Sequence, residues 1–218
     1  FNPSWGADLW ITNGEDKNGD NNQGKTLGGN VSYNHQGAQD KFVNLSFFTG
    51  PEQDAFSSTA VPGSEGRKRD RVSHGGQWIW DHWTLAWEGE LLRETFPSAW
   101  VQGASGNTIR GTLTAFGTWL KVQVTPVYSG YLRLEQIYDD LGFRVNWDNA
   151  IATGHAMRVN ADLRLQAASL GIERRMGPAF VRAEVRHDRI NRDLVDRDGH
   201  VFRQVTSATL AVGASFGQ

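Results

Sequence analysis

The feature that most constrains the fold is a repeated alternation of apolar and polar residues with a period of two. In residues 179–188, AFVRAEVRHD, the odd positions are mostly small and apolar, whereas four of the five even positions are charged. Residues 83–94, 130–139 and 207–216 alternate in the same way. A period of two is typical of a β-strand with one apolar and one polar face. The sequence therefore predicts an all-β chain of about ten strands.

The charged rows indicate which kind of sheet this is. A soluble β-sheet protein would have to neutralise each charge that it buried in its core, whereas a transmembrane β-barrel turns one face to lipid and the other to a polar lumen. The chain also has 25 glycines, 9 tryptophans and no cysteine. The lack of cysteine excludes disulfides, thiolate metal sites and C-x-x-C-H haem attachment. Its net charge of −2 gives no basic field for nucleic acid.

The connections between the expected strands alternate in length. Short connections are expected at 35–39, 79–82, 125–129 and 176–178, and long ones at 13–25, 50–70, 96–109, 140–157 and 189–202. Short periplasmic turns and long extracellular loops are typical of outer-membrane barrels. We therefore expect an antiparallel transmembrane β-barrel with an even number of strands. A slip in the alternation near Ala167 and Ala168 predicts a β-bulge there.

The first long connection, NGEDKNGDNNQGK, partly matches the pattern of a calcium-binding loop. Asp16, Asn18 and Asp20 occupy the first, third and fifth positions of an EF-hand pattern. The sixth position is Asn21 instead of glycine, and the twelfth is Leu27 instead of a bidentate carboxylate. The segment is therefore interpreted as a solvated extracellular loop, with a weak cation site as the minor alternative.

Several segments resemble a known family. WITNGEDKNGDNNQGKTLGGNVSY, FVNLSFFTGPEQD, YLRLEQIYDDLGFR, FVRAEVRHDRIN and VTSATLAVGASFG are similar, in this order, to segments of the putative beta-barrel porin-2 (OmpL-like) family of bacterial outer-membrane porins. Such porins are expected to be longer, with additional strands before residues 5–12. We therefore expect residues 1–218 to form one barrel domain, or the C-terminal portion of a longer barrel.

The resemblance implies passive diffusion of small hydrophilic solutes or ions through a water-filled barrel, with no catalytic residue and no cofactor. Charges that face the lumen would then select solutes by charge and size. They would also pair with one another and stiffen the wall, and both roles are compatible. The candidate pore-lining residues are Glu88, Glu90, Lys121, Arg133, Glu135, Asp139, Arg182, Glu184, Arg186 and Asp188.

Aromatic residues are the second group of candidates. Trp and Tyr concentrate where an apolar membrane meets water, so we expect a girdle made by Trp78, Trp80, Trp83, Trp87, Tyr131, Tyr138 and Phe216. Trp10 and Trp119 are expected on the lumenal face, where a sugar could stack on them. The expected partners are outer-membrane lipid, small polar solutes or ions, and further copies of the chain as a homotrimer or a larger outer-membrane complex.

Three other classes were weighed. An outer-membrane hydrolase would need a catalytic pair, and His187–Asp188 is the one pair worth testing; the sequence contains no G-x-S-x-G and no H-E-x-x-H motif. A structural barrel around an electron-transfer partner would leave no ligand motif in this chain. A soluble all-β binding protein is disfavoured by the charged rows.

Overall fold

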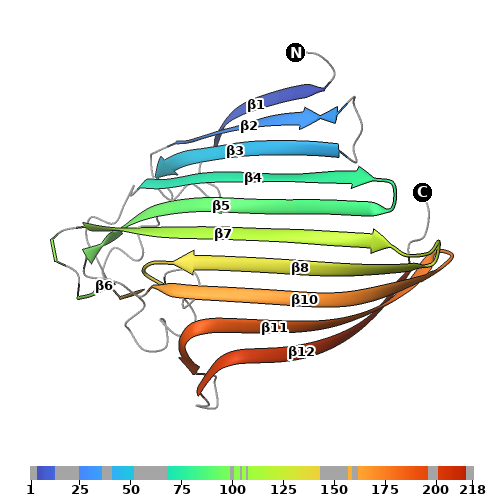
Figure 1. Cartoon of the computed structure of the whole chain (residues 1–218). Coiled ribbons are helices and arrows are strands. Elements are labelled where there is room, and N and C mark those ends of the chain that lie inside the picture. Colours follow the sequence, from blue (N-terminus) through green and yellow to red (C-terminus); the bar gives the residue numbers. More distant parts are fainter. Residues whose placement is uncertain are drawn as a thin grey trace.

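The computed structural model describes residues 4–12, 25–35, 41–51, 68–98, 101–103, 105–106, 108–142, 157–158, 162–195 and 201–214. Ten long strands form a single antiparallel sheet in chain order (Figure 1). They are β1 (Trp5–Thr12), β2 (Thr26–Asn34), β3 (Lys41–Pro51), β4 (Lys68–Trp80), β5 (Trp83–Pro97), β7 (Thr108–Gln123), β8 (Tyr128–Asp139), β10 (Leu163–Met176), β11 (Ala179–Val195) and β12 (Val201–Ala214). Two short strands, β6 (Val101–Gln102) and β9 (Met157–Arg158), pair in parallel outside this sheet. The all-β, antiparallel fold predicted from the sequence is confirmed.

Each strand pairs with the next one along the chain, as expected when strands are joined by hairpins. β1 and β12 are the two edges, so the described sheet is open, and it curves most strongly at β10–β12 (Figure 1). Among the described residues there is no helix long and apolar enough to cross a membrane.

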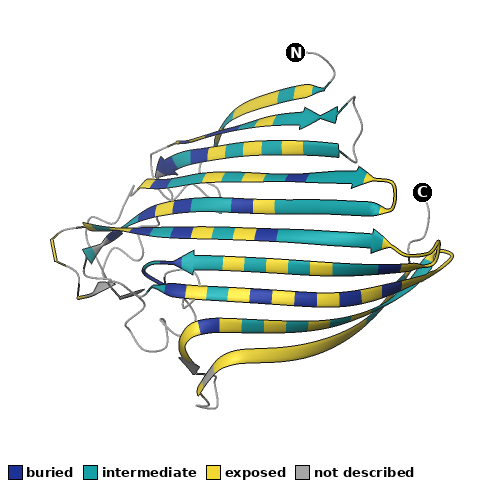
Figure 2. Ribbon diagram, viewed as in Figure 1, coloured by how far each residue is buried: buried dark blue, intermediate teal, exposed yellow. Residues whose placement is uncertain are grey.

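The two faces of the sheet differ in chemistry because residues paired across strands share a face. The face that we call the polar face carries Glu88, Lys121, Arg133, Glu173 and Arg186. The opposite, apolar face carries Leu45, Leu85, Leu132, Leu170 and Val185. Figure 2 shows the resulting alternation of exposed and less exposed positions along β3, β8 and β10.

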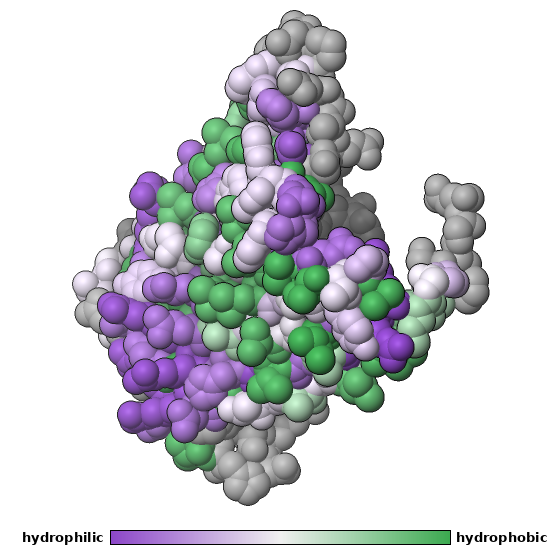
Figure 3. All heavy atoms as spheres, turned by 45° about the vertical axis from the view of Figure 1, so that its right-hand side comes forward, coloured by the Kyte–Doolittle hydropathy of each residue, from purple (hydrophilic) through white to green (hydrophobic). Residues whose placement is uncertain are grey.

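The apolar face is exposed. Large hydrophobic side chains protrude from it along the sheet, including Leu9 at 77% exposure, Leu170 at 66% and Leu210 at 73%. Figure 3 shows hydrophobic side chains forming a contiguous area of the surface, beside a hydrophilic area. An exposed apolar area of this extent marks contact with a membrane or a protein.

Short connections lie at one end of the sheet and long ones at the other (Figure 1). We call these ends the turn side and the loop side. Asp81 and His82 alone separate β4 from β5, and Gly177 and Pro178 alone separate β10 from β11. The last long connection differs from the prediction, because β11 continues to Val195 and only residues 196–200 separate it from β12.

The predicted bulge near Ala167 was wrong. β10 pairs without interruption with both β8 and β11, and Ala167 and Ala168 simply face opposite sides. Both residues are small, which is why the sequence alternation fades there. The irregularity lies one strand later, in β11 between Arg189 and Leu194.

Candidate pore wall

All ten candidate pore-lining residues lie on the polar face, as the cross-strand register shows for β5, β7, β8 and β11. The polar face also contains charged residues that were not predicted, on β4, β5 and β10. The charged side chains form three groups, and the groups differ in the number of opposite charges that each central residue contacts.

The first group is centred on Glu135 of β8. Its two carboxylate oxygens accept hydrogen bonds of 2.5 Å from Arg133 Nη2 and from Arg186 Nη1. Arg186 also lies 2.8 Å from Asp188. The charged residues of β8 and β11 therefore interact, although β10 lies between these two strands.

Small residues on β10 make that contact feasible. Its polar-face positions between the two charged rows are Ala167, Ser169 and Gly171. None of these side chains fills the space above the strand, so long side chains from β8 and β11 meet over it. Tyr131 uses the same gap: its hydroxyl donates a 2.6 Å hydrogen bond to Glu184 of β11.

The second group is centred on Glu173 of β10, which is only 3% exposed. Its carboxylate contacts Lys121 at 3.3 Å, Arg175 at 3.2 Å and Arg182 at 2.5 Å. Glu173 thus links Lys121 of β7, Arg175 of β10 and Arg182 of β11 in the turn-side part of the wall. Sequence reasoning missed Glu173 because the supposed bulge left the face of the following residues undefined; an uninterrupted alternation would have placed it correctly.

The third group lies on β4 and β5. Arg69 and Glu94 form a buried pair joined by two hydrogen bonds of 3.1 Å, a bidentate geometry that gives a strong contact. Two residues further along β4, Arg71 reaches diagonally across to Glu90 of β5 at 2.9 Å. Arg69 falls in the connection predicted at 50–70, and the alternation in residues 71–80 is poor, so neither arginine was predicted as part of the wall.

An apolar cluster covers the polar face at the loop side. Leu92, Phe96, Leu113 and Leu141 are each 7% exposed or less and pack together. Leu141 lies two residues beyond the end of β8 and packs in this cluster, so the start of that connection folds over the wall. The wall is thus charged through its middle, and at its loop-side end an apolar cluster lies beside the buried Arg69–Glu94 pair and Asp139. The sequence did not predict this division.

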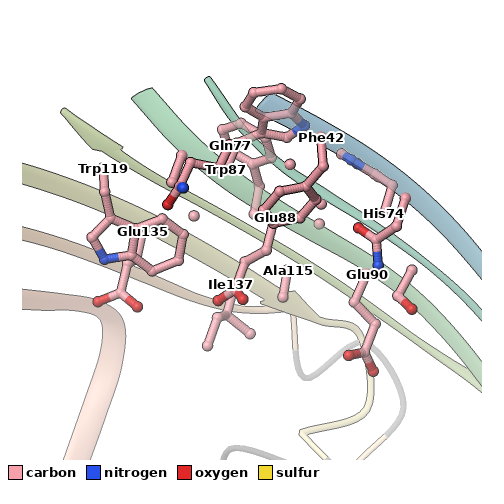
Figure 4. A pocket seen from close by; sticks show the side chains of 18 of the residues that line it. Phe42, His74, Gln77, Trp87, Glu88, Glu90, Ala115, Trp119, Glu135 and Ile137 are labelled. Carbon is pink, nitrogen blue, oxygen red and sulfur yellow. The ribbon is translucent and has the colours of Figure 1, made fainter. Parts of the chain in front are cut away.

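A cavity of about 550 Å³ opens on the polar face between β3 and β8 (Figure 4). Its polar lining includes Asn44, Arg71, Gln77, Glu88, Glu90 and Glu135, and Trp119 forms part of its wall. In Figure 4, Glu88 lies between Trp119 and Glu90. The cavity therefore combines carboxylates, an arginine, amides and an aromatic ring.

The aromatic candidates divide between the two faces. Trp78, Trp80, Trp83 and Trp87 lie on the apolar face towards the turn side, and Tyr138 lies on that face at the loop-side end of β8. Tyr131 differs, because it lies on the polar face and bonds to Glu184. Phe216 and the three loop residues Asp16, Asn18 and Asp20 lie outside the described residues.

Both predicted lumenal tryptophans lie on the polar face. Trp10 packs over Gly28, where an added Cβ would come within 2.2 Å of the indole nitrogen. Trp119 is covered by the guanidinium of Arg133, whose Cζ lies 4.9 Å from the ring centroid. This distance is typical of a cation–π contact.

The histidine pair considered for hydrolysis does not form. His187 lies on the apolar face and contacts Thr206 at 2.9 Å, whereas Asp188 lies on the polar face beside Arg186. The two side chains point to opposite sides of β11 and cannot act on one substrate.

The family described as "Putative beta-barrel porin-2, OmpL-like" matches residues 1–216 of the chain. A comparison with curated proteins finds no match.

Proposed function

Since the chain belongs to the putative beta-barrel porin-2, OmpL-like family, we propose that it is an outer-membrane porin through which small hydrophilic solutes and ions diffuse passively. The observation that carries this proposal is the contrast between the two faces of one sheet. Exposed Leu, Val and Ile side chains suit contact with lipid tails, while rows of charged residues suit contact with water. No step of passive diffusion requires a catalytic residue or a cofactor.

In this proposal residues 1–218 form one barrel domain or the C-terminal portion of a longer barrel, the turn side faces the periplasm and the loop side faces the outside. The tryptophans of β4 and β5 would then lie at the periplasmic boundary of the bilayer. Their rings combine apolar area with an N–H donor, which suits this boundary. Tyr138 would lie at the outer boundary.

The polar face would select solutes chiefly through charges that are not already neutralised. The carboxylate of Glu173 is already held by three cations, so it stiffens the wall more than it attracts further cations. The apolar cluster of Leu92, Phe96, Leu113 and Leu141 would narrow the pore at its outer end and favour small solutes.

Liposome swelling tests the proposal. Vesicles containing the purified, folded protein are diluted into isotonic solutions of a pentose, a hexose, a disaccharide and a trisaccharide, and light scattering follows the entry of each sugar. A porin predicts fast swelling with the smallest sugar and progressively slower swelling with the larger ones. Swelling no faster than in protein-free vesicles, with folding verified by heat-modifiable gel mobility, would contradict a passive pore.

A further inference from the structure

The cavity between β3 and β8 has one carboxylate that differs from its neighbours. Resting on the proposed porin function, we propose that Glu88 and Trp119 form a binding site for the guanidinium or ammonium group of small organic cations that pass through the pore. Both residues line the cavity, and both lie on the polar face.

Charge balance identifies Glu88. Of the three glutamates that line the cavity, Glu90 is held by Arg71 at 2.9 Å, and Glu135 is held by Arg133 and Arg186 at 2.5 Å each. For Glu88, in contrast, the described part of the chain offers neither an ion pair nor a hydrogen bond, and the residue is exposed. An uncompensated carboxylate on a low-dielectric wall attracts cations into the cavity.

Trp119 supplies the second half of the site. The side chain of Glu88 and the ring of Trp119 converge over Gly117, since a Cβ added there would lie 3.1 Å from Trp119 Cη2 and 3.6 Å from Glu88 Cγ. Because Gly117 has no side chain, the indole and the stem of Glu88 approach each other over it, and both border the cavity. An ammonium or guanidinium group placed there would face both groups at once.

The same wall already contains one guanidinium group that is bound by an indole ring and a carboxylate. The guanidinium of Arg133 lies over the Trp119 ring at 4.9 Å and donates a hydrogen bond to Glu135 at 2.5 Å. One indole and one carboxylate thus bind one guanidinium. Glu88 presents a second carboxylate beside the same ring, without a cation of its own.

The remaining lining narrows the class of ligand. Asn44, Ser73 and Gln77 supply hydrogen-bonding groups along β3 and β4, which suits a solute with polar groups beyond its charged end. An inorganic cation would use the carboxylate but not the indole. An organic cation would use both, so the site should distinguish the two kinds of ion.

The test is block of single-channel current by agmatine, which carries both a guanidinium and an ammonium group. Wild-type protein in a planar bilayer, in symmetric KCl, should show brief interruptions of current that become more frequent with agmatine concentration. Glu88→Gln should weaken the apparent affinity about tenfold, as expected when one close opposite charge is removed. Trp119→Leu should weaken it roughly threefold, because the cation–π contact is lost.

Asp8→Asn is the matched control. Asp8 lies on the polar face of β1 and is exposed, but it does not line the cavity. Its removal changes the net charge of the wall by the same amount and should leave agmatine block within about twofold of wild type.

The outcomes separate the two proposals. Open channels that agmatine blocks equally well in wild type and in Glu88→Gln would overturn the site and leave the porin function intact. An equal loss of block in Asp8→Asn would also overturn it, because the effect would then be one of overall charge. If the wild type carries no current, the porin function fails, and calorimetric titration of the folded protein with agmatine tests the site alone: binding that Glu88→Gln weakens supports the site, and equal or absent binding overturns it.

Discussion

Tyr131 of β8 donates a 2.6 Å hydrogen bond to Glu184 of β11, passing over Gly171 of the strand between them. The three residues are directly opposite one another in the sheet. A Cβ at Gly171 would lie 2.2 Å from Tyr131 Cζ, so the tyrosine ring occupies the volume in which any other side chain would stand. The link between the two strands therefore depends on the residue that has no side chain.

We expect Gly171→Ala to destabilise the protein by about 1–3 kcal/mol, because the added methyl group forces the ring of Tyr131 away and breaks its hydrogen bond. The measurement is urea unfolding in detergent micelles. Gly130→Ala is the control, since a Cβ there would meet nothing nearer than 3.8 Å. It should be neutral or slightly stabilising. Equal loss in both variants would show that the ring does not depend on Gly171.

Glu173→Gln should cost about 1–3 kcal/mol of unfolding free energy, because Lys121, Arg175 and Arg182 would lose the carboxylate that they share. The loss of stability is moderate because the side chains of the three cations are 34–64% exposed, so water would solvate them in the variant. Thermal unfolding in micelles checks it. Glu88→Gln, which removes an exposed carboxylate, should shift the free energy by no more than about 0.5 kcal/mol.

Selectivity should respond to the central charge group. Glu135→Gln removes the carboxylate shared by Arg133 and Arg186, and the more positive wall should move the reversal potential in a KCl gradient towards the chloride equilibrium potential. Arg186→Gln should move it in the opposite direction. No shift in either variant, or shifts of the same sign, would show that these charges do not face the permeating ions.

The assignment of the two faces predicts a difference between adjacent residues of β12. Thr209 lies on the polar face opposite Glu184, and Leu210 lies on the apolar face with 73% exposure. The chain has no cysteine, so single cysteines can be labelled uniquely. In liposomes, Thr209→Cys should react with a membrane-impermeant thiol reagent at least about tenfold faster than Leu210→Cys, since the reactive thiolate forms only in water. Similar rates would contradict the assignment.

Much of this wall could be predicted from the sequence, because the side on which a residue lies follows from local alternation. In this way the sequence predicts one common face for every candidate from Glu88 to Asp188, and in the structure all of them lie on the polar face. Which charges pair could not be predicted. Glu135 and Arg186 meet only because the intervening strand has Ala167, Ser169 and Gly171 on that side, and a pattern within one strand does not show how far a side chain reaches over its neighbour.

The features of β10 and β4 that the sequence did not predict correctly have the same physical cause. Ala167 and Ala168 are both small, so the sequence does not show which of them lies on which face. The side of the sheet on which Glu173 lies could therefore not be assigned. In β4 the segment HGGQ interrupts the alternation of apolar and polar side chains, because Gly75 and Gly76 have no side chain. The strand was therefore hard to recognise from the sequence. In the structure the ring of His74 packs over Gly89, and the ring of Trp87 packs over Gly76. Aromatic rings of one strand thus occupy the space beside the glycines of the neighbouring strand.

The most direct test of the central claim is the conductance of the purified full chain in a planar lipid bilayer. The account predicts discrete, reproducible current steps in KCl, with a reversal potential on the cation side in a salt gradient because Glu88 adds uncompensated negative charge to the wall. A folded and inserted protein that stays electrically silent would contradict an open pore. The polar face would then have to be occupied or closed, as in a structural barrel around a partner.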